Sequence, residues 1–125
     1  MISGNLVFTA GQIPLIDGKL MATGKLGADI DTEQGAQIAE RCALNALAAI
    51  KSVLGDLDRV KQVVKVVGFV ASVPEFTAQP SVINGASEFL QQVFGDDGKH
   101  ARSAVGVPVL PLDAPVEVEL IVEFE

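Results

Sequence analysis

The chain has 125 residues, 49% of them hydrophobic, which suits one domain built around one hydrophobic core. It carries 16 acidic residues, 9 scattered basic residues and neither Tyr nor Trp, for a net charge of −7, so it lacks the clustered cations and stacking aromatic side chains that bind nucleic acid. Because no uncharged apolar stretch of about 18 residues and no signal-peptide pattern occurs, we expect no membrane partner and a cytoplasmic location.

The N-terminal part is predicted to form a β-hairpin or meander. The segment Asn5–Gln12 reads NLVFTAGQ, a short apolar strand that ends at Gly11. Asp17-Gly18 then lies between two apolar runs, and this residue pair favours a two-residue hairpin turn. The sequence also allows a further short strand near Thr23.

Two helices are predicted from caps and from apolar residues at helical spacing. Asp31 and Gln34 resemble a capping box, and the first helix is expected to stop at Gly55. The second begins at Gln79-Pro80, because proline suits the first turn, and ends at Gly95. The apolar side of the first helix comprises Ile38, Cys42, Ala46, Ile50 and Val53.

Three strands are predicted around the second helix. Gln62–Val73 is almost continuously apolar, as expected for a central strand. The segment that begins at Ala101 is the second, and Val116–Glu125 alternates apolar and acidic residues. Asp113–Pro115 supplies turn residues, so we expect a hairpin that brings the last two strands together.

The element order is therefore β-β-α-β-α-β-β, which predicts an α+β fold with a mixed sheet and both helices on one face. The central strand is apolar on both sides, so the other face of the sheet needs cover. A second copy of the chain is the simplest cover. We find no repeat or linker and predict a single domain over residues 1–125.

Two charged residues near the C-terminus are candidates for chemistry. Arg102 follows a loop, and its guanidinium can grip a carboxylate through two parallel hydrogen bonds. The alternative is a surface arginine in an ordinary ion pair. Glu117 can position or deprotonate water if the predicted hairpin brings it near Arg102, although alternating glutamates are also typical of a solvated face.

Other residues carry weaker signals. Gly11 can offer backbone N–H groups to a ligand, but a glycine there can simply end the strand. His100 can shuttle protons, although a single histidine in a charged loop is expected to be exposed. With Cys42 the only cysteine and His100 the only histidine, one subunit has no Cys/His zinc site, and Cys42 is expected to be buried.

Three segments together carry a family resemblance: SGNLVFTAGQIPL at Ser3–Leu15, ARSAVGV at Ala101–Val107 and LPLDAPVEVEL at Leu110–Leu120. They resemble the RidA family, also called YjgF and often labelled L-PSP endoribonuclease. The intervening sequence fits in order and length, so the resemblance covers nearly the whole chain. The NGASE segment at Asn84–Glu88 is similar to a less studied branch of that family.

This resemblance implies a chorismate-mutase-like subunit in a homotrimer whose sheets form a central barrel, with ligand clefts between subunits. It also implies hydrolysis of 2-aminoacrylate-type enamines and imines to 2-oxo acids and ammonia, without a cofactor or metal. By the same resemblance Arg102 binds the substrate carboxylate and Glu117 positions the attacking water. Backbone groups near Gly11 and Ala104 complete the cleft.

The sequence also departs from the family pattern. Ala10 stands where many members have serine, Gly106 replaces a frequent acidic residue, and Ser87 occupies the position of a frequent asparagine. Many members also have a further segment ahead of the position of Ser3, with an aromatic residue of the cleft. One alternative is therefore a non-catalytic module that binds a small carboxylate or regulates a partner enzyme. An endoribonuclease is the third hypothesis and ranks last, because the excess of acidic residues opposes binding to nucleic acid.

Overall fold

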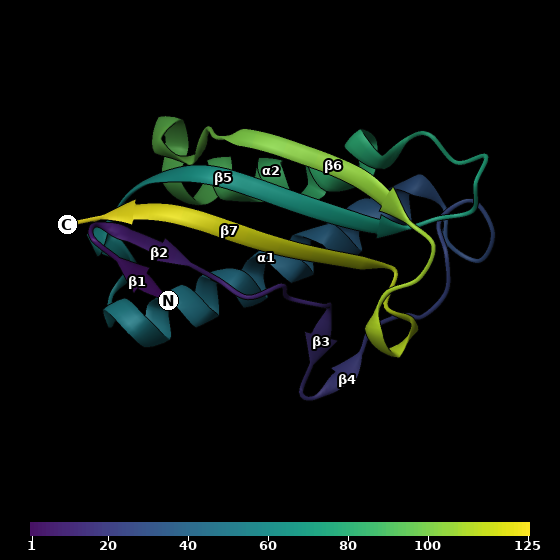
Figure 1. Cartoon of the computed structure of the whole chain (residues 1–125), viewed down its shortest axis with the longest axis horizontal. Helices are drawn as coiled ribbons and strands as arrows, with labels where there is room; N and C mark the ends of the chain where they lie inside the picture. The colour runs from purple at the N-terminus through teal and green to yellow at the C-terminus, as the bar shows by residue number, and fades with distance from the viewer.

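The computed structural model describes residues 1–125 as a five-stranded mixed sheet with two helices on one side (Figure 1). The helices are α1 (Thr32–Leu54) and α2 (Gln79–Phe94). The strand order in the sheet is β1-β2-β7-β5-β6. The strands are β1 (Ile2–Ser3), β2 (Leu6–Phe8), β5 (Val60–Ala71), β6 (Ala101–Val107) and β7 (Val116–Phe124). This confirms the predicted fold class, element order and helix placement.

The predicted N-terminal hairpin is present as a separate two-stranded unit. It joins β3 (Leu15–Ile16) to β4 (Lys19–Leu20) through Asp17-Gly18. Both turn residues have positive φ, 52° and 81°, as the two-residue turns that match strand twist require. In Figure 1 this hairpin projects away from the main sheet.

The predicted strand Asn5–Gln12 is shorter than expected. Only Leu6–Phe8 forms a strand, and Gln12 then makes a single bridge to Val118 on β7. No strand forms near Thr23. The segment from Gly11 to Gln12 therefore lies directly beside β7.

The helix boundaries follow the predicted caps. The Asp31 carboxylate accepts a hydrogen bond from the Gln34 backbone N–H at 2.8 Å, and α1 stops at Gly55, whose φ is 86°. The two helices cross closely at Gly85, where any Cβ would clash with the backbone carbonyl of Ala36. Neither helix is long and apolar enough to span a membrane.

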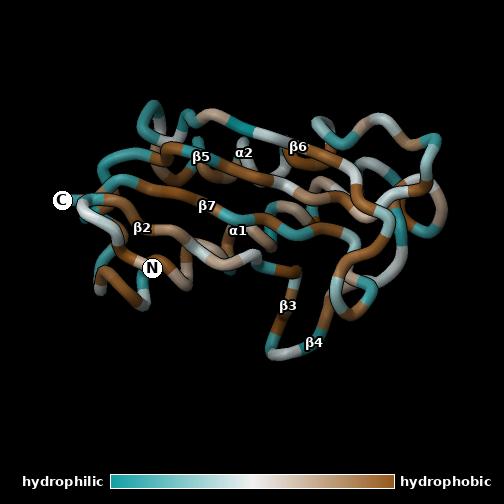
Figure 2. The backbone as a smooth tube through the Cα atoms, viewed as in Figure 1, coloured by the Kyte–Doolittle hydropathy of each residue, from teal (hydrophilic) through white to brown (hydrophobic).

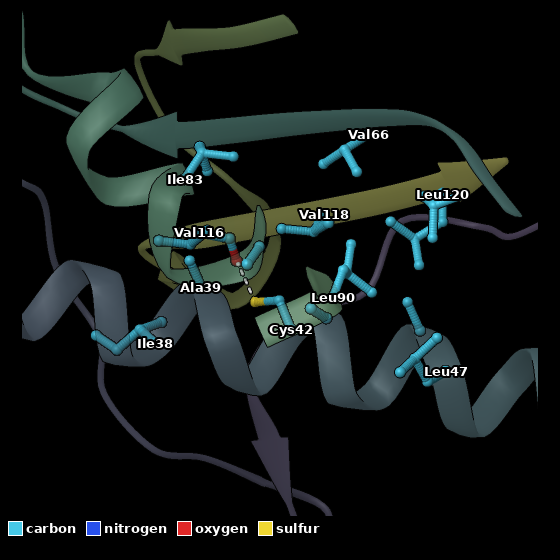
Figure 3. Packing of buried hydrophobic residues seen from close by; sticks show 14 of the residues in the cluster. Ile38, Ala39, Cys42, Leu47, Val66, Ile83, Leu90, Val116, Val118 and Leu120 are labelled. Carbon is cyan, nitrogen blue, oxygen red and sulfur yellow. Dashed lines mark hydrogen bonds between the residues drawn. The ribbon is translucent and has the colours of Figure 1, made fainter. Parts of the chain in front are cut away.

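The core lies between the helices and the sheet. Alternate residues of β7 point into it and are buried, namely Val116, Val118, Leu120 and Val122. Cys42 on α1 is fully buried, and its Sγ donates a hydrogen bond to the Val116 carbonyl at 3.5 Å (Figure 3). Burial strongly raises the pKa of this thiol. Cys42 is therefore structural, as expected.

The other face of the sheet carries both apolar and acidic side chains. On β7 these are Glu117, Glu119, Ile121 and Glu123, which alternate with the buried residues. On β5 the matching positions beside Glu117 and Glu119 are Phe69 and Val67. Figure 2 shows that β5 is hydrophobic along most of its length. Both helices lie on the opposite side of the sheet, and cover of this face by a second copy of the chain stays a prediction.

The predicted hairpin between the last two strands is wrong. Strand β6 pairs in parallel with β5, and β5 separates it from β7. The reason is that β5, α2 and β6 form a strand–helix–strand crossover, which places the second strand parallel to the first. Asp113 belongs to a short 3-10 helix that carries the chain past the end of β5 to β7.

Candidate functional site

Arg102 stands on the edge strand β6 and points to the helix side of the sheet. Its Nη1 donates hydrogen bonds to Asn84 Oδ1 at 2.8 Å and to Ser87 Oγ at 3.2 Å. Asn84 and Ser87 are three residues apart on α2, so they lie on the same face of that helix. An Nη atom carries two hydrogens, and both are engaged here. The Nη2 and Nε hydrogens remain free as a fork suited to a carboxylate.

Arg102 lines a polar pocket of about 290 Å³ between α2 and the start of β6. We call this the Arg102 pocket, and its lining residues are Asn84, Ser87, Gln91, Lys99, His100 and Arg102. None of them is acidic. Lys99 pairs with Asp96 at 3.2 Å, but both side chains are highly exposed, so this pair cancels little of the charge. The pocket is therefore suited to a small anion.

His100 is half-buried in this pocket, and the expectation of a simply exposed histidine is wrong. Its Nε2 lies 2.8 Å from Ser87 Oγ and its Nδ1 lies 2.7 Å from the Gly98 carbonyl oxygen. Ser87 thus connects His100 to Arg102. We missed Asn84 and Ser87 as site residues from the sequence. The available signal was a polar pair at helical spacing on α2, of which Ser87 is the one polar side chain among the buried residues of that helix.

Glu117 and Gly11 form a second polar region, which we call the Glu117 corner. Gln12 and Val118 exchange two backbone hydrogen bonds of 2.8 and 3.0 Å, which brings Gly11 beside Glu117. A Cβ at Gly11 would lie 2.7 Å from Glu117 Cδ and Oε1. Glycine is therefore needed here because the carboxylate rests against the backbone.

The Glu117 carboxyl has a raised pKa. Its partial burial raises the pKa above the ordinary value, and the nearby Glu119 carboxylate adds to the rise. It makes no hydrogen bond or ion pair within the chain. Such a group takes up a proton more readily than an ordinary glutamate. No group of three or more His, Cys, Asp or Glu side chains is placed to hold a metal ion.

One chain does not bring Arg102 and Glu117 together. Arg102 is opposite Val66 on β5, and Val66 is paired with Leu120 on β7, three residues beyond Glu117. The two residues are therefore about 10 Å apart across the strands and about 10 Å along them, and they face opposite sides of the sheet. Gly11 lies beside Glu117, whereas Ala104 lies on the same strand and the same face of the sheet as Arg102.

A larger cleft of about 580 Å³ lies at the far end of β6 and is lined by Lys25, Phe76, Gln79 and Gly106 among others. It contains none of the predicted catalytic residues. Lys25 is paired with Asp113 at 3.3 Å, and Gln79 Nε2 donates to Ser72 Oγ and the Phe76 carbonyl. Because this cleft holds neither Arg102 nor Glu117, we place the candidate site at the Arg102 pocket despite its smaller volume.

Comparisons with known proteins agree with this fold. A family model described as "YjgF/chorismate mutase-like, putative endoribonuclease" matches residues 1–124. Protein TCP17 of Trypanosoma cruzi is 48% identical over 123 residues, which are 98% of this chain and 77% of that protein.

Solved structures superpose over the full chain. Protein Atu1372 of Agrobacterium tumefaciens has a TM-score of 0.98 and 49% identity, and the match covers 100% of this chain and 79% of that one. TdcF of E. coli, solved with bound serine, has a TM-score of 0.63 and 25% identity, with coverage of 100% and 85%.

Proposed function

The chain belongs to the YjgF/chorismate mutase-like family, and from this premise we propose that it hydrolyses small enamine and imine acids of the 2-aminoacrylate type. The products are 2-oxo acids and ammonia. The observation that carries the proposal is the arrangement of Arg102, whose Nη1 is held by Asn84 and Ser87 while the rest of its guanidinium is free. A guanidinium that other side chains already hold in place loses little side-chain entropy when it binds a carboxylate.

The chemistry requires one more group, which is Glu117. Once the imine carbon is held through the carboxylate on Arg102, water must add to that carbon and lose a proton. A carboxylate near the water can orient it and accept the proton. The raised pKa of Glu117 makes it a better proton acceptor than an ordinary glutamate.

Because Arg102 and Glu117 lie far apart in one chain, we propose that each site combines the Arg102 pocket of one copy with the Glu117 corner of the next. The backbone of β6 pairs only with β5, so its outer edge is free to meet another subunit. A head-to-tail contact forms a ring when the rotation between copies closes, and we expect this ring to be a homotrimer with a central barrel. Its uncovered sheet faces, which carry Phe69 and Val67, would line the inside.

Complementation of two inactive variants tests this arrangement. Arg102→Ala and Glu117→Gln are each expected to lose most of their activity alone, because every site lacks one group. Co-expressed at equal amounts, they form mixed rings in which about a quarter of the sites contain both residues. Ammonia release from 2-aminoacrylate should therefore recover to about that fraction of the wild-type rate.

The control is a mixture of Arg102→Ala with the double variant Arg102→Ala/Glu117→Gln, in which no chain has Arg102. It should stay inactive. No recovery in the first mixture, or a single 13.0 kDa species in sedimentation equilibrium, would contradict a site shared between subunits.

A second candidate is a module that binds a small carboxylate without turning it over. The specific observation in its favour is that the Arg102 pocket is built entirely by one chain, far from Glu117. TdcF, which was solved with bound serine, also binds a molecule with a carboxylate. Wild-type protein that binds 2-oxo acids through Arg102 but releases no ammonia from any imine would establish this candidate instead.

A further inference from the structure

The larger cleft of about 580 Å³, here called the Gln79 cleft, lies where the parallel strands β5 and β6 end. Figure 1 shows both strands ending on the same side of the molecule. Ser72 follows β5 directly, Val107 is the last residue of β6, and Gln79 is the first residue of α2. Ligands of α/β units commonly bind outside the carboxyl ends of parallel strands. The volume also falls within the range of small-molecule pockets, about 300–1,000 Å³.

The apolar part of the Gln79 cleft is held in a fixed shape. Phe76 is half-buried and packs against the main hydrophobic core. The Val73 N–H donates to the Leu26 carbonyl at 3.1 Å, and the Phe76 N–H donates to the Val73 carbonyl at 3.1 Å. The other apolar side chains that line the cleft are Pro74, Val107 and Pro108. Such a wall favours an aromatic ring, which can pack against that of Phe76.

Gln79 supplies a hydrogen-bond acceptor to this cleft. The Phe76 carbonyl can only accept, so the amide atom 2.8 Å from it is Nε2, whose other hydrogen goes to Ser72 Oγ at 3.3 Å. Ser72 in turn donates its hydroxyl hydrogen to the Val70 carbonyl at 3.1 Å. Neither side chain has a hydrogen left for a ligand. Gln79 Oε1 accepts no hydrogen bond within the chain and is not buried, so it remains a free acceptor.

Gly106 leaves the space that this arrangement needs. A Cβ at this position would lie 2.7 Å from Gln79 Nε2 and 2.9 Å from Ser72 Oγ. A side chain here would therefore push the amide away from Ser72 and occupy part of the cleft. The glycine keeps both the amide in place and the cleft open.

The charge of the Gln79 cleft differs from that of the Arg102 pocket. Lys25 is the one charged residue that lines it, and Lys25 Nζ lies 3.3 Å from Asp113 Oδ1. A cation with a carboxylate beside it leaves little net charge for a ligand to balance. The Arg102 pocket, by contrast, is lined by cations and by no carboxylate. An uncharged ligand therefore suits the Gln79 cleft better than an acid does.

We propose that the Gln79 cleft binds an uncharged aromatic compound whose ring carries an N–H or O–H donor, and that this donor bonds to Gln79 Oε1. A ring without such a donor would displace water from Oε1 and leave the acceptor unpaired, which costs binding free energy. The inference goes beyond the proposed function, because the Gln79 cleft and the Arg102 pocket share no lining residue.

Indole and benzofuran are matched probes, because an oxygen atom in benzofuran replaces the ring N–H of indole. Titration of the whole protein, followed through its backbone amide NMR signals, should shift Phe76 and Gly106. We expect indole to bind about three- to tenfold more tightly than benzofuran, the scale of one neutral hydrogen bond. In Gln79→Met, which has a side chain of similar length without the acceptor, this preference should disappear. Gln92→Met makes the same change elsewhere on α2 and should keep it.

Two further variants separate this site from the Arg102 pocket. Gly106→Leu should lose binding of both probes, because the new side chain fills the cleft. Arg102→Ala should bind indole as wild type does. Wild-type protein that binds indole but releases no ammonia from any imine would contradict the proposed function alone.

Three results would overturn the inference. The first is the absence of shifts at Phe76 and Gly106 with millimolar indole. The second is equal affinity of wild type for indole and benzofuran, or an unchanged preference in Gln79→Met. The third is indole-3-carboxylate that binds the cleft of Arg102→Ala protein more tightly than indole does, since the ligand would then be an acid.

Discussion

The Arg102 pocket and the Glu117 corner differ in how much of their surroundings the chain itself supplies. Two side chains of α2 hold the guanidinium of Arg102. The carboxylate of Glu117, by contrast, rests on Gly11 and has another glutamate as its nearest charge. One region is preorganised for an anion, and the other holds a carboxylate without a counter-charge. From this difference we expect mutations in the Arg102 pocket to act mainly on ligand binding and mutations in the Glu117 corner to act mainly on turnover.

The largest effect is expected at the Glu117 corner. Glu117→Gln keeps the shape of the side chain but cannot accept a proton from water, so the catalysed rate of ammonia release should fall by about 10²- to 10⁴-fold. Affinity for pyruvate, measured by calorimetry, should stay the same because the Arg102 pocket is untouched. Glu119→Gln is the matched change two residues away and should cost much less. Equal losses for the two variants would remove the special role of Glu117.

A smaller effect, on binding, is expected at the Arg102 pocket. Arg102→Ala should weaken pyruvate binding by about 2–3 kcal/mol, or roughly 30- to 150-fold, the scale of charge-assisted hydrogen bonds. Arg102→Lys should recover little, because a point charge cannot reproduce the fork. Melting temperatures should remain close to wild type, with Lys61→Ala as a control cation elsewhere on the surface. Unchanged binding in Arg102→Ala would contradict the site assignment.

The smallest effect concerns stability and pH. Because the folded state raises the pKa of Glu117 above its ordinary 4.5, the ionised carboxylate opposes folding at neutral pH. This cost disappears as the pH falls through the raised pKa. Glu117→Gln should therefore melt about 1–2 °C above wild type at pH 7 and no higher near pH 4. Glu40→Gln, on the exposed side of α1, serves as the control. If the difference in melting temperature between Glu117→Gln and wild type instead grew toward low pH, the prediction would be contradicted.

Much of the fold could be predicted because its signals are local. The capping pair Asp31 and Gln34, the turn Asp17-Gly18 and the alternation along β7 each act within a few residues. The structure confirms these elements. The predicted hairpin at Asp113–Pro115 was wrong. Turn residues between two successive strands favour a hairpin, but they do not reveal that an earlier strand, β5, lies between β6 and β7 in the sheet.

The sequence by itself determined the helices, the buried side of β7 and the identity of the candidate residues, since periodicity and caps depend on near neighbours. Only the tertiary structure decided that Arg102 lies over α2 and away from Glu117. That result depends on the crossover from β5 through α2 to β6, which places residues 18 positions apart within hydrogen-bond distance. The contact of His100 with Ser87 has the same origin, because long-range packing selects such neighbours and no local pattern records them.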